Sequence, residues 1–232
     1  MARLSSWPRL LRTGLVLLRH DALIPKEASP LLPPVARFFA GILRALFAKK
    51  ENLRPGERYA KAFHDLGPAF IKLGQVLSTR GDIFGKQFIS DLSHLKDKLP
   101  PFSTAIAEAT IVASLGKAVD AIFSEFGEVL GAASIAQAHR AVLLDGRKVA
   151  VKILRPHIEE IIAADIDMLM LGARLVHAFV PFSRRLEPEA FVDTIAHSLR
   201  LELDLRLEAS ACDEIGQIIN AEPYMRAPKV VW

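Results

Sequence analysis

Residues 131–154 read GAASIAQAHRAVLLDGRKVAVKIL, and they give the strongest structural signal in this chain of 232 residues. Asp145-Gly146 lies between two runs of aliphatic and β-branched residues, a pattern typical of a β-hairpin. The small residues of 131–141 would let the backbone approach an anion closely, with its amide groups directed at the anion. Lys152 ends the run Val149-Ala150-Val151. The segment therefore predicts a small-residue loop, a hairpin, and a lysine on the second strand of that hairpin.

The same segment favours a nucleotide site of the kinase type. In a kinase small lobe, a lysine at the end of a V-A-I-K run on the third strand pairs with nucleotide phosphates. The loop differs from that of an ordinary kinase because it is rich in alanine, and each Cβ restricts the backbone and narrows the space above the phosphates. The alternative interpretation is a plain β-hairpin with an exposed lysine.

A second motif lies upstream, where residues 70–80 read FIKLGQVLSTR. Helical spacing would place Lys72 and Gln75 on one face, surrounded by apolar residues, so that this face buries a cation and an amide. A buried ammonium needs an anionic partner, either a carboxylate of the chain or a phosphate. Removing Lys72 from a buried pair would then cost ~3–5 kcal/mol. The alternative is an amphipathic helix on which the lysine reaches solvent.

A third motif is an acidic helix that begins at Glu187-Pro188-Glu189 and runs to about Asn220. Proline and acids in the first turn suit a helix N-terminus. In a kinase-like lobe, a glutamate on such a helix pairs with the lysine of the third strand. The candidates here are Glu202, Asp204 and Glu208, and the sequence does not assign them to Lys72 or Lys152. The alternative is a solvated helix with an i,i+4 pair worth a few tenths of a kcal/mol.

Together these motifs resemble the UbiB family of atypical kinase-like ATPases linked to ubiquinone synthesis. The first corresponds to the family's alanine-rich loop, although Gly131 stands where alanine is frequent. The second resembles the KxGQ motif, carried by Lys72, Gly74 and Gln75, and Glu202-Leu203-Asp204 resembles the ExD motif. Further segments resemble family landmarks: DALIP at 21–25, KDKLPPF at 96–102 and KILRP at 152–156.

The resemblance implies ATP binding and ATPase activity, without clear protein-kinase activity in trans, in a protein that supports ubiquinone-pathway enzymes. It also implies that the KxGQ helix packs across the nucleotide cleft and competes for the acids of the third motif. The implied nucleotide-binding residues are Leu130, Gly131, Ala132, Ala133, Ser134, Ile135, Ala136, Gln137, Ala138 and Lys152.

The kinase catalytic loop and the metal-binding D-F-G turn have no counterpart in this sequence. We therefore expect the N-terminal part of a longer protein, or a truncated gene product, with no catalytic residues and no activity by itself. Mg²⁺ is expected only in the full-length protein, which would supply the large lobe. The alternative function is a non-catalytic, membrane-associated pseudokinase scaffold. A single cysteine, Cys212, excludes an internal disulfide, and the seven histidines are too dispersed for a zinc site.

Charge is unevenly distributed, because residues 1–60 contain eleven Lys and Arg against four acids in a chain of net charge +4. Their apolar runs are too short and too interrupted by arginine to span a membrane. We expect interfacial helices on an anionic lipid surface, and no nucleic acid, because stacking aromatic residues are not interleaved with the charges. Ubiquinone-pathway enzymes or lipid intermediates are the other expected partners.

The expected location is the cytoplasmic face of a bacterial inner membrane. The alternative is the mitochondrial inner membrane, because Met1 to His20 has arginines, serines and no acid, as presequences do.

The predicted fold class is α+β and mostly helical. It combines a kinase-like small lobe, built on one small antiparallel sheet, with an N-terminal helical extension that carries the KxGQ motif, and it lacks the large lobe. The predicted domains are a basic membrane-proximal segment (1–55), the KxGQ extension (56–115) and the truncated lobe (116–232). Helices are expected at 5–20, 34–50, 57–79, 85–95, 103–115, 157–179 and 188–220, and strands up to 126, at 137–144 and at 148–154.

Overall fold

The computed structural model describes residues 7–23, 34–48, 52–81, 85–93, 95, 99–179, 181–219 and 224–232. Its elements in chain order are α1 (Trp7–Arg19), α2 (Pro34–Phe47), α3 (Pro55–Leu66), α4 (Pro68–Ser78), α5 (Lys86–Ser93), α6 (Thr104–Leu115), the 3₁₀ helix η3 (Val119–Ala121), β1 (Phe123–Ala132), β2 (Ala136–Leu143), β3 (Lys148–Leu154), α7 (Ile158–Phe179), the 3₁₀ helix η4 (Pro181–Leu186), α8 (Pro188–Leu203) and α9 (Leu205–Ile219). The described part is thus mostly helical with one small sheet, as predicted.

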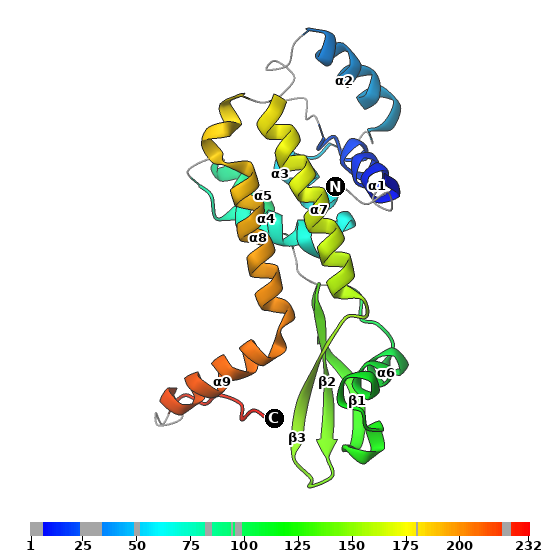
Figure 1. Ribbon diagram of the computed structural model, residues 1–232, viewed down its shortest axis with the longest axis vertical. Helices are drawn as coiled ribbons and strands as arrows, with labels where there is room; N and C mark the ends of the chain where they lie inside the picture. Colours follow the sequence, from blue (N-terminus) through cyan, green and yellow to red (C-terminus); the bar gives the residue numbers. More distant parts are fainter. Residues whose placement is uncertain are drawn as a thin grey trace.

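Figure 1 shows a helical part above and a sheet below, joined by α7, which leads from β3 into the helices. α8 returns antiparallel beside α7, and α9 turns away from it near the level of the sheet. Residues 5–6, 49–50, 94 and 220 of the expected helices lie outside the described residues. So do Ile24-Pro25 and 96–98 of the family landmarks. The domain boundaries at residues 55 and 115 stay predictions.

The sheet has the order β1-β2-β3 and is antiparallel throughout. Asp145-Gly146 makes the turn between β2 and β3, with Gly146 at φ 86°, a backbone conformation that glycine adopts without a steric penalty. The predicted hairpin is therefore confirmed. α6 covers one face of the sheet, and Ala107 and Ile111 form a small core with Phe123, Ala141 and Ile153.

The first strand extends beyond its predicted end at residue 126. Pairing continues through Gly131 with Ala138 and Ala132 with Gln137, with register shifts on the way. Small side chains do not prevent strand pairing, and β-bulges absorb the irregular stretches. The small-residue loop is consequently only a short turn, residues 133–135, between β1 and β2.

The main core lies between α3, α4, α5, α7 and α8. α4 contributes Ala69, Phe70 and Ile71, which are at most 5% exposed. Their largest fully buried neighbours include Ile162 on α7, Leu199 and Ile195 on α8, and Leu92 on α5. Burying aliphatic side chains of this size stabilises the fold by about 1.5–3 kcal/mol each. The apolar spacing that predicted these helices therefore corresponds to their buried faces.

Two predicted helices are each interrupted. The helix expected at 57–79 divides into α3 and α4 at Gly67, which has φ 115° and precedes Pro68. Proline cannot donate the next helical hydrogen bond, and it disfavours helical backbone in the residue before it. The acidic helix bends at Asp204 (φ −90°, ψ 90°), whose Oδ1 accepts a hydrogen bond from Arg206 N at 3.0 Å. Asp204 thus ends α8 and caps α9.

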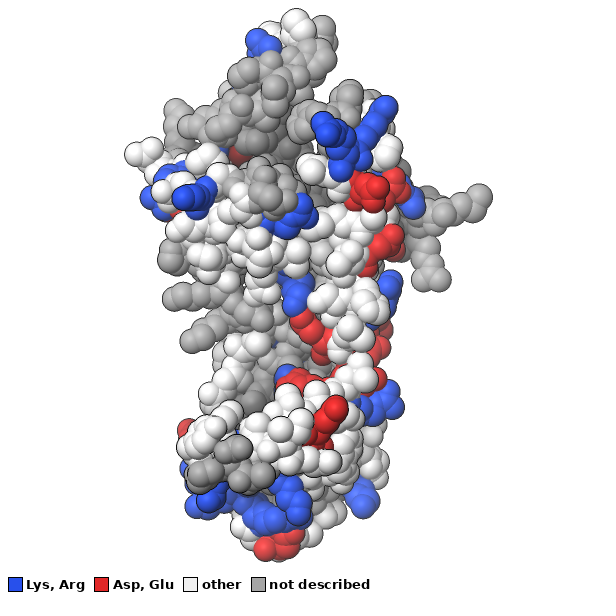
Figure 2. Space-filling model, turned by 90° about the vertical axis from the view of Figure 1, so that its left-hand side faces the viewer, with Lys and Arg blue, Asp and Glu red and all other residues white. Residues whose placement is uncertain are grey.

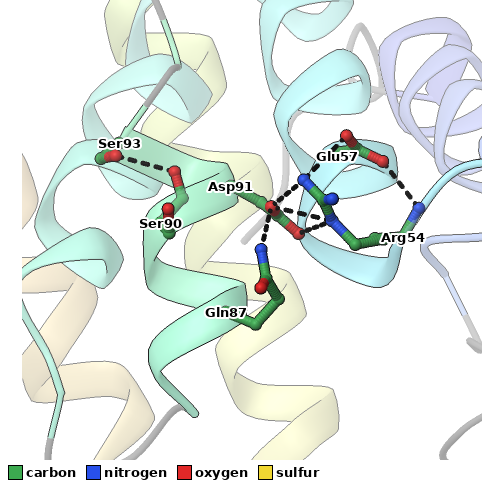
Figure 3. Close-up of polar contacts among 6 residues, drawn as sticks. All are labelled: Arg54, Glu57, Gln87, Ser90, Asp91 and Ser93. Carbon is green, nitrogen blue, oxygen red and sulfur yellow. Dashed lines mark hydrogen bonds and ion pairs between the residues drawn. The ribbon is translucent and has the colours of Figure 1, made fainter.

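A polar contact joins the start of α3 to α5 (Figure 3). The Asp91 side chain is 1% exposed and accepts hydrogen bonds from Arg54 Nη2 at 2.6 Å and Gln87 Nε2 at 3.0 Å. The backbone N of Arg54 donates to Glu57 Oε2 at 2.8 Å, which satisfies a free amide at the start of α3. The Asp91 hydrogen bond also raises the pKa of the Arg54 guanidinium. The buried carboxylate therefore fixes α5 against the start of α3.

The N-terminal helices are attached by ion pairs. Arg9 of α1 donates from Nε to Oδ1 of Asp165 on α7 at 3.1 Å, and the Asp165 side chain is 4% exposed. Burial raises the pKa of Asp165 to about 6, against the opposing charges of Arg9 and Arg12. Asp21 accepts from Arg44 of α2 at 2.7 Å and also from Arg58 of α3. α1 and α2 are thus linked to the core by charge as well as by packing.

None of the helices in the described part of the chain combines the length and apolar character needed to cross a bilayer.

Gly74 allows α4 to pack closely, because a Cβ there would lie 2.6 Å from Leu95 Cδ2 and 2.8 Å from Phe63 Cδ2. Gly74→Ala should therefore lower the free energy of unfolding by about 1–3 kcal/mol, the usual cost of overpacking. Gly172→Ala in α7 is the matched control, because its Cβ would meet nothing within 4 Å. The control should gain about 1 kcal/mol from helix propensity. Denaturant unfolding measures both, and a similar gain in both variants would exclude close packing at Gly74.

Candidate functional site

Lys152 of β3 forms an ion pair with Glu208 of α9. Their side chains are 46% and 58% exposed, so water reaches both groups. In the sheet, Lys152 lies opposite Ala138 of β2, and Ala138 lies opposite Gly131 of β1. The lysine therefore occupies the same row across the sheet as two residues of the small-residue segment. This arrangement places a partly exposed cation in the same row of the sheet as Ala138 and Gly131, which carry no large side chains.

Lys72 of α4 forms an ion pair with Glu202 of α8. Their side chains are 22% and 40% exposed, and Gln75 is half-buried. The cation and the amide are therefore only partly buried, not fully buried as expected, and Lys72 has a carboxylate as its anionic partner. The buried face of α4 is the adjacent one, with Phe70, Ile71 and Gly74, and Lys72 stands at its edge.

Asp204 binds Arg206 two residues later, where Arg206 Nε donates to Asp204 Oδ1 at 2.9 Å. The Arg206 hydrogen bonds hold the pKa of the Asp204 carboxyl below its ordinary value. The geometry thus assigns the open pairings as Lys72 with Glu202 and Lys152 with Glu208. Asp204, which lies between these two glutamates in the sequence, instead ends α8 and caps α9.

The remaining candidate residues follow the two strands. Leu130, Gly131 and Ala132 lie in β1, Ala133, Ser134 and Ile135 form the turn, and Ala136, Gln137 and Ala138 lie in β2. The turn is closed by a hydrogen bond from Ala133 N to Ala136 O at 2.8 Å. Leu130 is 57% exposed, whereas Gln137 is 1% exposed and binds the backbone of Phe102 through its amide. The side chain of Gln137 is therefore occupied within the protein.

His139 is fully buried below the turn. Its ring stacks on Phe126 with centroids 4.8 Å apart, Nδ1 lies 3.0 Å from Gly127 O, and Nε2 lies 2.7 Å from Gln137 Nε2. These contacts connect β1 and β2 and support a structural role.

Sequence reasoning gave Arg155 and Phe102 no role in the site. The Arg155 guanidinium binds the carbonyl oxygen of Ala133 in the turn, from Nε at 2.9 Å and Nη2 at 2.8 Å, and lies 5.7 Å from the Phe102 ring centroid. The available signal was that both residues lie in segments that resemble family landmarks, Phe102 in 96–102 and Arg155 in 152–156.

Charged side chains of both signs lie on the surface of the described part of the chain. On the face in Figure 2, basic side chains are visible toward both ends, with acidic side chains mostly between them. Among the described residues, no three His, Cys, Asp or Glu side chains are grouped as a metal site would require. Lys72 and Lys152 are each paired with a glutamate of the acidic helices.

An antiparallel sheet with a small-residue turn, and a lysine on its third strand paired with a glutamate of a later helix, defines a kinase-like small lobe. The model of the ABC1 atypical kinase-like domain matches residues 94–232. The chain belongs to this family.

Curated relatives extend the similarity to the N-terminal helices. The probable protein kinase UbiB of Pseudomonas aeruginosa strain UCBPP-PA14 is 37% identical over 99% of this chain and 44% of its own length. Those of Cellvibrio japonicus and Aeromonas hydrophila are 37% and 38% identical, over 97% and 96% of this chain and 40% and 41% of their lengths. The chain therefore spans about two fifths of the length of these bacterial relatives.

A solved structure supports the fold. The complex of Rv3197 with erythromycin from Mycobacterium tuberculosis has a TM-score of 0.51 and 24% sequence identity, covering 85% of this chain and 47% of that one. At this identity the likeness concerns the fold alone.

The coupling energy between Lys72 and Glu202 tests whether solvent reaches this ion pair, as its partial exposure indicates. A double-mutant cycle with Lys72→Ala and Glu202→Ala should give about 0.2–1 kcal/mol, because solvent screens a partly exposed pair. The exposed pair Arg174–Glu189 provides the control cycle, with side chains 66% and 43% exposed. A cost of ~3–5 kcal/mol for Lys72→Ala alone would instead indicate a buried pair.

Proposed function

We propose that this chain is the N-terminal part of an ATP-binding, kinase-like protein that supports ubiquinone biosynthesis at a membrane. The observation that carries the proposal is the Lys152–Glu208 pair beside the turn at 133–135. A kinase-like ABC1 domain implies ATP binding in general. The link to ubiquinone rests on the UbiB relatives, with which the chain shares more than a third of its residues.

The residues present suit a polyphosphate. Lys152 is nearly half exposed, so its ammonium can contact a phosphate oxygen while Glu208 restrains the side chain. In the turn beside it, Ser134 and Ile135 are buried and Ala133 is partly exposed, so a ligand would approach its backbone at Ala133. ATP, when bound, would supply the γ-phosphoryl group for hydrolysis or transfer.

We assign Lys72, Gly74 and Gln75 to holding α4 in place beside this site. The Lys72–Glu202 pair connects α4 to α8, two residues before the bend at which α8 ends and α9 begins. Because Glu202 and Glu208 lie on either side of this bend, the position of α4 influences where Glu208 meets Lys152. The motif thus acts on the nucleotide site through α8 and α9.

Lys152→Ala should weaken ATP binding at least roughly tenfold, because a charge-assisted hydrogen bond contributes about 1.5–3 kcal/mol. Lys148→Ala at the exposed start of the same strand is the control, and it should bind as the wild type does. Isothermal titration calorimetry with magnesium present measures the affinity. Equal affinity in Lys152→Ala and wild type would remove Lys152 from the site.

We further propose that α1 and α2 rest on an anionic lipid surface, at the cytoplasmic face of a bacterial inner membrane. An apolar stripe at helical spacing on α2 supports this: Phe38, Phe39, Ile42 and Leu46 are 67%, 59%, 41% and 70% exposed. On α1, Leu11 and Leu15 are 62% and 49% exposed. Basic residues outnumber acids in this region, which favours anionic headgroups. Lipid intermediates or enzymes of the ubiquinone pathway would be met at this surface.

Co-sedimentation with vesicles of phosphatidylglycerol and phosphatidylethanolamine tests the lipid proposal. The double variant Phe38→Ser, Phe39→Ser should bind more than roughly tenfold more weakly, because each phenyl ring contributes about 1.5–3 kcal/mol when buried. Raised salt should weaken wild-type binding, because screening acts over ~8 Å at physiological ionic strength. Leu144→Ser, at a residue 63% exposed in the β2–β3 turn, is the control. If both variants sediment like wild type, the lipid surface lies elsewhere.

A further inference from the structure

Arg155 connects the small-residue turn to the segment that precedes α6. Its Nε and Nη2 donate to Ala133 O at 2.9 and 2.8 Å, and Nη2 also donates to Pro100 O at 3.0 Å. The backbone N of Arg155 donates to Ile135 O at 2.9 Å. One residue thus holds the carbonyl groups at both ends of the turn.

Phe102, against which the Arg155 guanidinium lies, is held in place by Gln137. The guanidinium lies over the Phe102 ring, a cation–π arrangement. Gln137 of β2 accepts a hydrogen bond from Phe102 N at 2.9 Å and donates one to Phe102 O at 3.1 Å. Because Gln137 is 1% exposed, these bonds are shielded from water. The turn, Arg155, Phe102 and β2 therefore form a closed ring of contacts.

The direction of the Ala133 carbonyl matters for an anionic ligand. A carbonyl oxygen that faces a phosphate is repelled by it, whereas an amide N–H attracts it. Two charge-assisted hydrogen bonds from a planar guanidinium hold this oxygen more firmly than neutral donors would. The oxygen that Arg155 engages is thereby kept from facing a bound phosphate.

We propose that Arg155 is a positioning residue that sets the turn at 133–135 in the conformation that accepts nucleotide phosphates. This inference rests on the proposed nucleotide site and identifies which residue shapes its loop. Arg155 acts through the backbone of the turn and does not itself contact the nucleotide. Its loss should therefore change nucleotide affinity together with the order of the turn.

The test uses Arg155→Gln, which loses the charge, and Arg155→Lys, which keeps the charge and loses the planar fork. Hydrogen exchange of amides 133–138 should accelerate on the order of tenfold in Arg155→Gln, because two charge-assisted bonds are lost. ATP affinity measured by calorimetry should fall by a similar factor, with Arg155→Lys intermediate in both readouts. Arg147→Gln is the matched control, because Arg147 pairs with Asp145 in the neighbouring turn.

The outcomes separate the possibilities. Faster exchange with unchanged ATP affinity in a folded variant would make Arg155 merely structural and overturn the inference, as would unchanged exchange. If Lys152→Ala weakens ATP binding and the Arg155 variants do not, this inference fails and the proposed function stands. If the wild type itself binds no ATP, the proposed function fails and the inference fails with it. If Arg155→Gln does not fold, Arg155→Lys decides by the same two readouts.

Discussion

The burial of one face of α4 is the constraint on which the rest of the arrangement depends. Ala69, Phe70 and Ile71 are inserted between α3, α5, α7 and α8, and Gly74 lets α4 approach Phe63 closely. Because a helix has only one orientation once a face is buried, Lys72 is placed at the edge next to α8. The packing of α4 therefore determines where Lys72 lies. Its ion pair with Glu202 orients the helix and adds little to the free energy of unfolding.

The bend at Asp204 lies between Glu202, which pairs with Lys72 of α4, and Glu208, which pairs with Lys152 of the sheet. At the bend α9 leaves the direction of α8 (Figure 1), and Glu208, in the first turn of α9, pairs with Lys152. A short side chain that binds its own backbone two residues ahead is sufficient to start a new helix. The three acids thus have different roles. Glu202 pairs with Lys72 of α4, Asp204 forms the bend, and Glu208 pairs with Lys152 of β3.

Local signals predicted most of the fold. The Asp145-Gly146 turn and Lys152 within β3 could be placed because turn chemistry and strand alternation act over few residues. The break at Gly67 could have been foreseen from Pro68, yet the apolar spacing on both sides favoured one long helix. The exposure of Lys72 and the contact of Arg155 with the turn depend on partners far away in the chain. No local pattern encodes such contacts, because they are set by how the helices and the sheet pack.

The docking of α1 depends on pH through the buried carboxyl of Asp165. Its pKa is about 6 in the folded chain against an ordinary 3.8. Folding therefore takes up a proton in that window, and the stability that the neutral carboxyl provides is present below pH 3.8 and lost as the pH rises through about 6. Above the window the carboxylate attracts Arg9, while its own desolvation opposes folding. The ion pair that holds α1 is therefore strongest above about pH 6, where the buried Asp165 carboxylate is charged and its desolvation costs most.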